Sequence, residues 1–131
     1  MSMHIQIGKT YHLSASHQLK ALPPEHPCSR LHGHNYEITI VVKGKINRFG
    51  FVIDYRLIDT IFGDRLMAAW DHRHLNDVLG SEDGVATTAE LLVAHLCDQA
   101  SRWFASDAPE VKIHSITVRE TAKTFASVTF P

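Results

Sequence analysis

The stretch His34–Val42, HNYEITIVV, predicts a β-strand because β-branched and aromatic residues dominate it. Polar and apolar residues also alternate from His4 toward His17, which predicts an earlier strand that ends near His17. Between the two strands lies Lys20–Cys28, whose three prolines are incompatible with regular structure. The first third of the chain is therefore expected to be two strands joined by an irregular loop.

Downstream of these strands, the patterns predict two helices followed by two more strands. Asp54 can cap the first helix, and Thr87 or Thr88 can cap the second. Residues 71–85 are rich in turn signals and are expected to form a loop. The expected elements are helices at about Tyr55–Trp70 and Thr88–Phe104 and strands at Val111–Glu120 and about Thr124–Phe130.

The order strand, strand, helix, helix, strand, strand predicts a single α+β domain over residues 1–131. Its four-stranded antiparallel sheet is expected to carry both helices on one face. Such a sheet has open edges and an underfilled second face, so we expect copies of the chain to join into a larger sheet or barrel.

The composition is that of an ordinary globular protein, with 44% hydrophobic and 21% charged residues. A net charge of −1 and the lack of a basic run argue against nucleic acid and against a polybasic membrane anchor. No run approaches the roughly 18 apolar residues of a spanning helix, and the N-terminal stretch does not have the pattern of a secretion signal. We therefore expect a cytoplasmic protein with free thiols at Cys28 and Cys97.

Histidine is unusually abundant, with ten in 131 residues. His32 and His34 are two residues apart, so an extended backbone points both imidazoles to one face. His17 closes the neighbouring strand and can supply a third imidazole. Three neutral nitrogen ligands suit Zn²⁺ and leave a fourth position open, as in catalytic zinc sites. The alternative is three ordinary surface or hydrogen-bonding histidines.

Two cysteines and two acidic groups complete the candidate residues. Cys28 lies four residues before His32, where it can act as a base, as a nucleophile, or as a fourth ligand that closes the site. Cys97 has helical apolar spacing and is expected to be a small buried hydrophobe.

Asp71–His72 can form a carboxylate–imidazole pair, or simply belong to a polar loop. Glu120 can accept two hydrogen bonds from an amidine-like edge, or be a solvated strand end.

Together these stretches resemble the 6-pyruvoyl-tetrahydropterin synthase / 6-carboxy-tetrahydropterin synthase family. The match extends in the same order over nearly the whole chain. It is carried by Ser14–His17, Cys28–Tyr36, Gly50–Asp54, Asp71–Asn76, Thr88–Glu90 and Arg119–Thr121.

The resemblance implies the tunnelling fold (T-fold), in which subunits join their sheets into barrels and form active sites at their interfaces. It also implies a homo-oligomer, a hexamer built as a dimer of trimers, and the substrate 7,8-dihydroneopterin triphosphate. The implied roles are zinc ligation by His17, His32 and His34, acid/base catalysis by Cys28 with Asp71 and His72, and pterin binding by Glu120 with Thr88, Ala89 and Glu90.

The spacing of three residues between Cys28 and His32 resembles the bacterial 6-carboxy branch, which releases acetaldehyde and feeds queuosine and other 7-deazaguanine synthesis. A 6-pyruvoyl synthase is the alternative within the family, and a zinc-stabilised binding module without turnover is the alternative outside it. No motif identifies the triphosphate site, for which Arg30, Arg73, Lys123 and the remaining histidines are unranked candidates.

Overall fold

The computed structural model describes residues 3–131, and its framework is a long pair of antiparallel strands. Strand β1, Ile5–His17, pairs with strand β2, His32–Gly44, from Ile5 opposite Gly44 to His17 opposite His32. Because side chains alternate along a strand, the odd-numbered residues of β1 and the even-numbered residues of β2 share a face. His17, His32 and His34 therefore lie together on one face, at one end of the strand pair.

The sheet has five strands in the order β3-β1-β2-β4-β5. Strand β4, Lys112–Thr121, is antiparallel to β2, and β5, Thr124–Thr129, is antiparallel to β4. Strand β3 is only Arg73–His74 and runs parallel to β1 beside Ala15 and Ser16. The predicted four antiparallel strands are confirmed, but the predicted sheet is wrong in strand number and in being purely antiparallel. A two-residue strand has no periodicity that a sequence can show.

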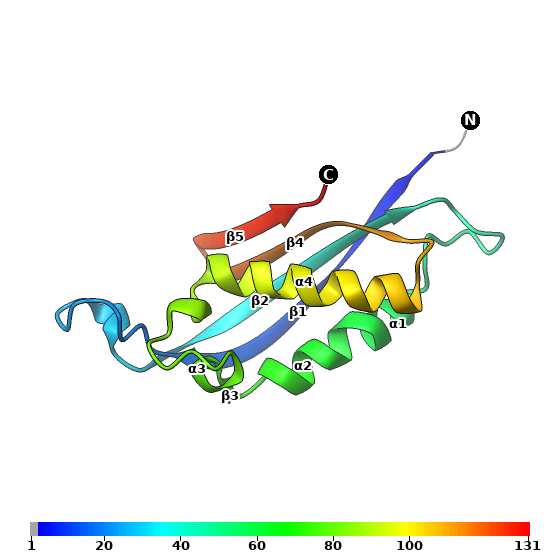
Figure 1. Ribbon diagram of the computed structural model, residues 1–131. Helices are drawn as coiled ribbons and strands as arrows, with labels where there is room; N and C mark the ends of the chain where they lie inside the picture. The colour runs from blue at the N-terminus through cyan, green and yellow to red at the C-terminus, as the bar shows by residue number, and fades with distance from the viewer. Residues whose placement is uncertain (1–2) are drawn as a thin grey trace.

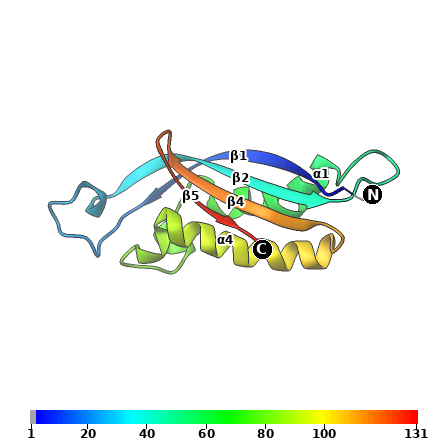
Figure 2. The same cartoon turned by 90° about the horizontal axis from the view of Figure 1, so that it is seen from above.

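Two long helical segments cover one face of this sheet (Figures 1 and 2). The first consists of α1, Tyr55–Ile58, a π-helical turn, Asp59–Gly63, and α2, Asp64–Trp70, without a break between them. The second is α4, Ala89–Asp107. The core lies between these helices and the sheet. Its largest fully buried side chains are Trp70, Tyr36, Phe62, Ile38, Ile40, Ile58, Ile61, Leu66, Leu75, Leu92, Leu96 and Ile116.

The predicted helix starts are confirmed by their caps. The side chain of Asp54 accepts a hydrogen bond from the Arg56 amide at 2.8 Å, and that of Thr88 accepts one from the Leu91 amide at 3.3 Å. The expected loop at residues 71–85 is wrong in part, because this segment also contains β3 and a short helix α3, Leu75–Val78. The expected order of six elements is correspondingly incomplete. Within residues 3–131, no helix is long and apolar enough to cross a membrane.

Candidate metal centre and the hollows beside it

Three histidine side chains converge where β1 ends and β2 begins. One ring nitrogen from each of His17, His32 and His34 lies within 4.8 Å of the other two. The ring centroid of His17 is 4.5 Å from that of His32 and 5.2 Å from that of His34. We call these three residues the histidine group. Their convergence follows from the strand register, which sets His17 directly opposite His32.

Hydrogen bonds to backbone carbonyls orient two of these rings. Nδ1 of His17 donates to the carbonyl oxygen of Thr87 at 3.1 Å, and Nδ1 of His32 donates to that of Arg30 at 2.7 Å. A proton on Nδ1 leaves the lone pair on Nε2. In the described chain, Nε2 of all three histidines is buried without a hydrogen-bond partner. Buried lone pairs that face one another without a partner fit a metal ion.

The backbone behind His17 is braced by Asn76 and Gly84. The Asn76 side chain accepts from the Gln18 amide at 3.0 Å and donates to the Gln18 carbonyl at 2.8 Å. Gly84 has φ +82°, and a Cβ at this position would collide with the same carbonyl. The turn at Gly84 leads directly to Thr87, so the segment that orients His17 is fixed against the strand that carries it.

Burial favours the unprotonated form of two of the three imidazoles, those of His17 and His34. Burial, aided by the nearby His32, lowers the pKa of His17 to about 4. Burial also lowers the pKa of His34, although the negative charge of Glu120 opposes that shift. Neutral imidazoles are the form that binds metal, so His17 is ready to bind an ion at neutral pH. The donor set of three imidazoles matches that of catalytic zinc sites.

A hollow of about 220 Å³ brings together the residues expected to bind a pterin. Glu120, near the end of β4, faces the start of α4, where Thr88 is the cap. Glu120 Oε1 lies 3.8 Å from Nε2 of His34, so this hollow adjoins the histidine group. We call it the Glu120 hollow. Its lining residues are Leu19, Thr88, Ala89, Glu90, Glu120, Thr124 and Phe125.

Tyr36 is a site residue that the sequence analysis did not single out. Its hydroxyl is buried without a hydrogen-bond partner in the described chain, and its ring centroid is 5.5 Å from that of His34. Burial, with the nearby charge of Glu120, raises its pKa above the ordinary value. The signal was present in the sequence, because Tyr36 continues the same alternation as His32 and His34.

Cys28 lies on a short 3-10 turn, Pro27–Ser29, just before β2. The Leu19 amide donates to its carbonyl at 3.0 Å, which ties this turn to the end of β1. Among the described residues, the convergent ligand atoms come from the three histidines and do not include the Cys28 thiol. The structure therefore supports an open three-nitrogen site over one closed by cysteine. Cys97 is buried, and burial raises the pKa of its thiol to about 11. The thiol therefore stays neutral, in agreement with the expected small buried hydrophobe.

Asp71 and His72 form the expected pair. Asp71 Oδ1 accepts from the Ser14 amide at 3.0 Å and lies 3.0 Å from Nδ1 of His72. These two contacts, chiefly the bond from Ser14, hold the pKa of Asp71 below its usual value. His72 has φ +58°, a left-handed conformation that is uncommon for a residue with a side chain. Its amide donates to the Ser14 carbonyl at 2.6 Å, which helps to keep this conformation.

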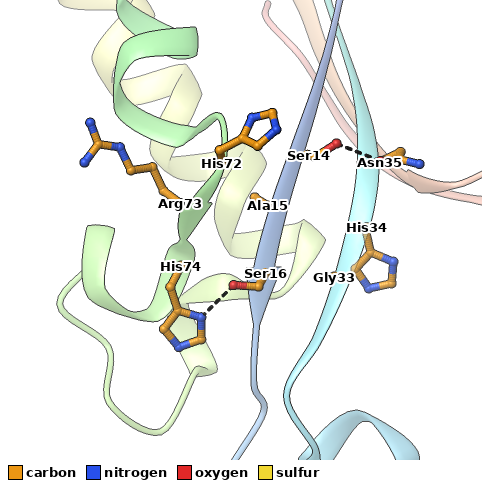
Figure 3. A pocket seen from close by; sticks show the side chains of 9 residues that line it. All are labelled: Ser14, Ala15, Ser16, Gly33, His34, Asn35, His72, Arg73 and His74. Carbon is orange, nitrogen blue, oxygen red and sulfur yellow. Dashed lines mark hydrogen bonds between the residues drawn. The ribbon is translucent and has the colours of Figure 1, made fainter.

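The imidazole of His72 lies in a second hollow, of about 550 Å³ (Figure 3). Ser14, Ser16 and Asn35 line it and alternate along their strands with the histidine group, so these side chains belong to the opposite face of the sheet, although His34 also borders the hollow. We call it the His72 hollow. It does not bring His72 to Cys28 or Glu120 within one chain. The lining residues are Ser14, Ala15, Ser16, Gly33, His34, Asn35, His72, Arg73 and His74.

Comparison with known proteins agrees with this arrangement. Residues 6–130 match the family described as 6-pyruvoyl tetrahydropterin synthase. A probable 6-carboxy-5,6,7,8-tetrahydropterin synthase of Halobacterium salinarum is 35% identical over 74 residues, which are 56% of this chain and 45% of that protein. A 6-pyruvoyl tetrahydrobiopterin synthase of Dictyostelium discoideum is 29% identical over 87 residues, 66% of this chain and 64% of that protein. The matches thus span less than two thirds of these relatives.

A solved structure shows the same fold. The 6-pyruvoyl tetrahydropterin synthase of Caenorhabditis elegans superposes with a TM-score of 0.80, over 98% of this chain and 97% of that one. The two sequences are 19% identical. The similarity extends to the whole architecture, including the strands that carry the histidine group.

Proposed function

This chain belongs to the 6-pyruvoyl tetrahydropterin synthase family, and on that premise we propose that it is a zinc-dependent 6-carboxy-5,6,7,8-tetrahydropterin synthase. The reaction converts 7,8-dihydroneopterin triphosphate into 6-carboxytetrahydropterin and releases acetaldehyde and triphosphate. Its product serves queuosine and other 7-deazapurine synthesis. One observation carries the proposal: the histidine group, with three unpartnered Nε2 atoms, adjoins the Glu120 hollow through the 3.8 Å approach of Glu120 to His34.

His17, His32 and His34 hold the zinc ion in this proposal. When bound, zinc supplies a positive charge that favours the deprotonated form of the substrate's side-chain hydroxyls. The carbonyls of Thr87 and Arg30 fix the Nδ1–H tautomers of two ligands and thereby aim their Nε2 atoms at the ion. The buried hydroxyl of Tyr36 lies beside them and can donate a hydrogen bond to the oxygens of a bound side chain.

Glu120 anchors the pterin ring. A carboxylate accepts two parallel hydrogen bonds from the amidine-like edge of a 2-amino-4-oxopterin. Thr88, Ala89 and Glu90 line the same hollow at the start of α4, where the peptide N–H groups of the first turn have no partner within the helix and can bind a ligand. Recognition of the ring therefore lies next to the metal, which is where the substrate's side chain begins.

Cys28 and His72 act as the acid/base groups that transfer protons to and from the substrate. Proton transfer between carbon atoms needs an acid/base group on each side of the substrate. Cys28 lies on the loop that leads into β2, whereas the Asp71–His72 pair faces the His72 hollow on the opposite face of the sheet. One chain cannot place both on one substrate, so we propose that a neighbouring copy supplies His72. A homo-oligomer, a dimer of trimers as the family resemblance implies, provides this neighbour.

The choice of the 6-carboxy branch rests on the three-residue spacing between Cys28 and His32. The relatives carry both names, 6-carboxy and 6-pyruvoyl synthase. Mass spectrometry of the products from zinc-loaded protein and 7,8-dihydroneopterin triphosphate separates the possibilities. Carboxytetrahydropterin with acetaldehyde is the expected result, and the pyruvoyl product would move the chain to the other branch. Bound zinc without turnover would overturn the synthase and leave a binding module.

A further inference from the structure

The His72 hollow is rich in hydrogen-bond donors. Ser14 Oγ donates to Asn35 Oδ1 at 2.7 Å, so the amide nitrogen of Asn35 stays free to donate elsewhere. Ser16 Oγ lies 2.9 Å from Nδ1 of His74. Figure 3 shows Ser14 beside the imidazole of His72, with the Ser16–His74 pair farther along the two strands. No Asp or Glu is among the lining residues, and the one carboxylate beside them, that of Asp71, is already bound by the Ser14 amide and lies 3.0 Å from Nδ1 of His72. The donors that remain suit an anion.

Arg73 adds a full positive charge at the edge of this hollow. Figure 3 shows its side chain extending away from the imidazoles of His72 and His74. The guanidinium is exposed and makes one long hydrogen bond, 3.4 Å from Nη2 to the carbonyl of Ala68. A contact that long is weak, so little holds the side chain in this position. Arginine is also well suited to bind phosphate oxygens, because its planar fork donates two parallel hydrogen bonds.

The chemistry of the proposed substrate links this hollow to phosphate. The side chain of 7,8-dihydroneopterin triphosphate has three carbons, with the triphosphate on the third. If His72 acts as acid or base on the first or second carbon, then the carbon that carries the triphosphate is one or two bonds away. Side chains that neighbour His72 are therefore within reach of the phosphate chain.

We propose that the His72 hollow, with Arg73 as its cation, binds the triphosphate of a substrate whose pterin ring is held by a neighbouring copy of the chain. This inference rests on the proposed function for the identity of the ligand. It ranks Arg73 above Lys123 as a phosphate-binding residue, because Arg73 shares a hollow with His72 whereas Lys123 lies in the turn between β4 and β5.

Direct binding of inorganic triphosphate to the zinc-loaded protein, measured by calorimetry, tests the site without turnover. Arg73→Gln is expected to weaken binding at least about tenfold, because a charged hydrogen-bonding group is lost. Arg73→Lys keeps the charge and should recover part of the affinity. Arg48→Gln is the matched control, since Arg48 is exposed in the loop that follows the Gly44 end of β2, whereas the histidine group lies at the His32 end. No binding to the unaltered protein, or equal binding by Arg73→Gln, would overturn the proposal.

A competition experiment distinguishes binding of the substrate's triphosphate from binding of free triphosphate. In the Cys28→Ala protein, bound 7,8-dihydroneopterin triphosphate should exclude inorganic triphosphate, and in the active protein Arg73→Gln should raise KM more than it lowers kcat. Simultaneous binding of both would overturn the assignment to substrate and leave a site for free triphosphate. Absence of turnover together with Arg73-dependent triphosphate binding would sink the proposed function alone. Turnover with unchanged KM in Arg73→Gln would sink this inference alone.

Discussion

Glu120 Oε1 lies 3.8 Å from Nε2 of His34. The separation is too long for a hydrogen bond and leaves the lone pair of His34 without a partner. It nevertheless places the Glu120 hollow directly beside the histidine group. Glu120 lines a hollow at the start of α4, and His34 belongs to the histidine group. A ligand that fills the hollow and reaches the histidines would meet a carboxylate at one end and three imidazole nitrogens at the other.

Glu120→Gln should therefore weaken substrate binding without releasing the metal. The amide nitrogen would face the donors of the pterin edge, and loss of a hydrogen bond to a charged group corresponds to a rise in KM of about tenfold or more. Steady-state kinetics and metal analysis on the same preparation check both points. Glu110→Gln, an exposed residue just before β4, is the control and should change neither. Loss of zinc from Glu120→Gln would show that the carboxylate supports the metal instead.

The metal-free protein should lose stability as the pH falls below neutrality. The pKa of His17 is about 4 in the folded chain and 6.5 ordinarily, so the unfolded chain takes up the proton first. The contribution to the free energy of unfolding is complete above pH 6.5 and is lost progressively down to about pH 4. Linkage gives a loss of about 2 kcal/mol from pH 7 to pH 5 for this one group.

Urea unfolding of metal-free protein at pH 7 and pH 5 measures this loss. His17→Asn should show a smaller pH dependence, because the titrating group is gone while a polar side chain remains near Thr87. Equal free energies of unfolding at the two pH values in the unaltered protein would mean that His17 is not held neutral by its surroundings.

Cys28→Ala should abolish turnover and keep the zinc. The thiol is not part of the convergent ligand group, and its turn, Pro27–Ser29, is held by backbone hydrogen bonds. Removal of a general acid or base lowers rates by roughly 10² to 10⁴-fold. Activity assays with metal analysis by mass spectrometry test both halves. A Cys28→Ala protein that releases its zinc would make Cys28 a fourth ligand and the site a structural one.

Mixed oligomers test whether two copies share each active site. Cys28→Ala and His72→Ala chains should each be inactive alone, whereas co-expressed chains with distinct tags should regain activity. Random mixing places an intact Cys28 beside a neighbour's intact His72 in about a quarter of the sites. Activity of the purified mixed oligomer is the readout. If oligomers that contain both chains regain no activity, a single chain must supply the whole active site.

Most of the fold could be predicted from local patterns. The alternation in β1 and β2 and the caps at Asp54 and Thr88 are short-range signals, and the structure confirms them. Strand β3 could not be predicted in this way. Its two residues lie where they do because Asp71 and His72 bond to the backbone of Ser14, 57 and 58 residues earlier in the sequence. Such pairing depends on tertiary contacts, which a local pattern of polar and apolar residues cannot predict.

In the candidate site, too, some features can be predicted from the sequence and others only from the structure. The spacing of His32 and His34 predicts a shared face, and the register of β1 with β2 brings His17 to them. The carbonyl of Thr87, which orients His17, comes from a turn 70 residues away and has no sequence signal of its own. The location of His72 on the opposite face likewise depends on β3. The sequence therefore predicts the three candidate ligands, whereas the structure adds the orientation of their rings and the position of His72.

The most direct test of a zinc-dependent synthase is to titrate metal-free protein with Zn²⁺ while measuring acetaldehyde release from 7,8-dihydroneopterin triphosphate. Activity should rise in proportion to zinc and stop at one ion per chain. His34→Ala should stay metal-free and inactive, whereas His12→Ala, with its exposed ring, should titrate normally. Full activity before zinc is added, or one bound zinc per chain without turnover, would contradict the proposal.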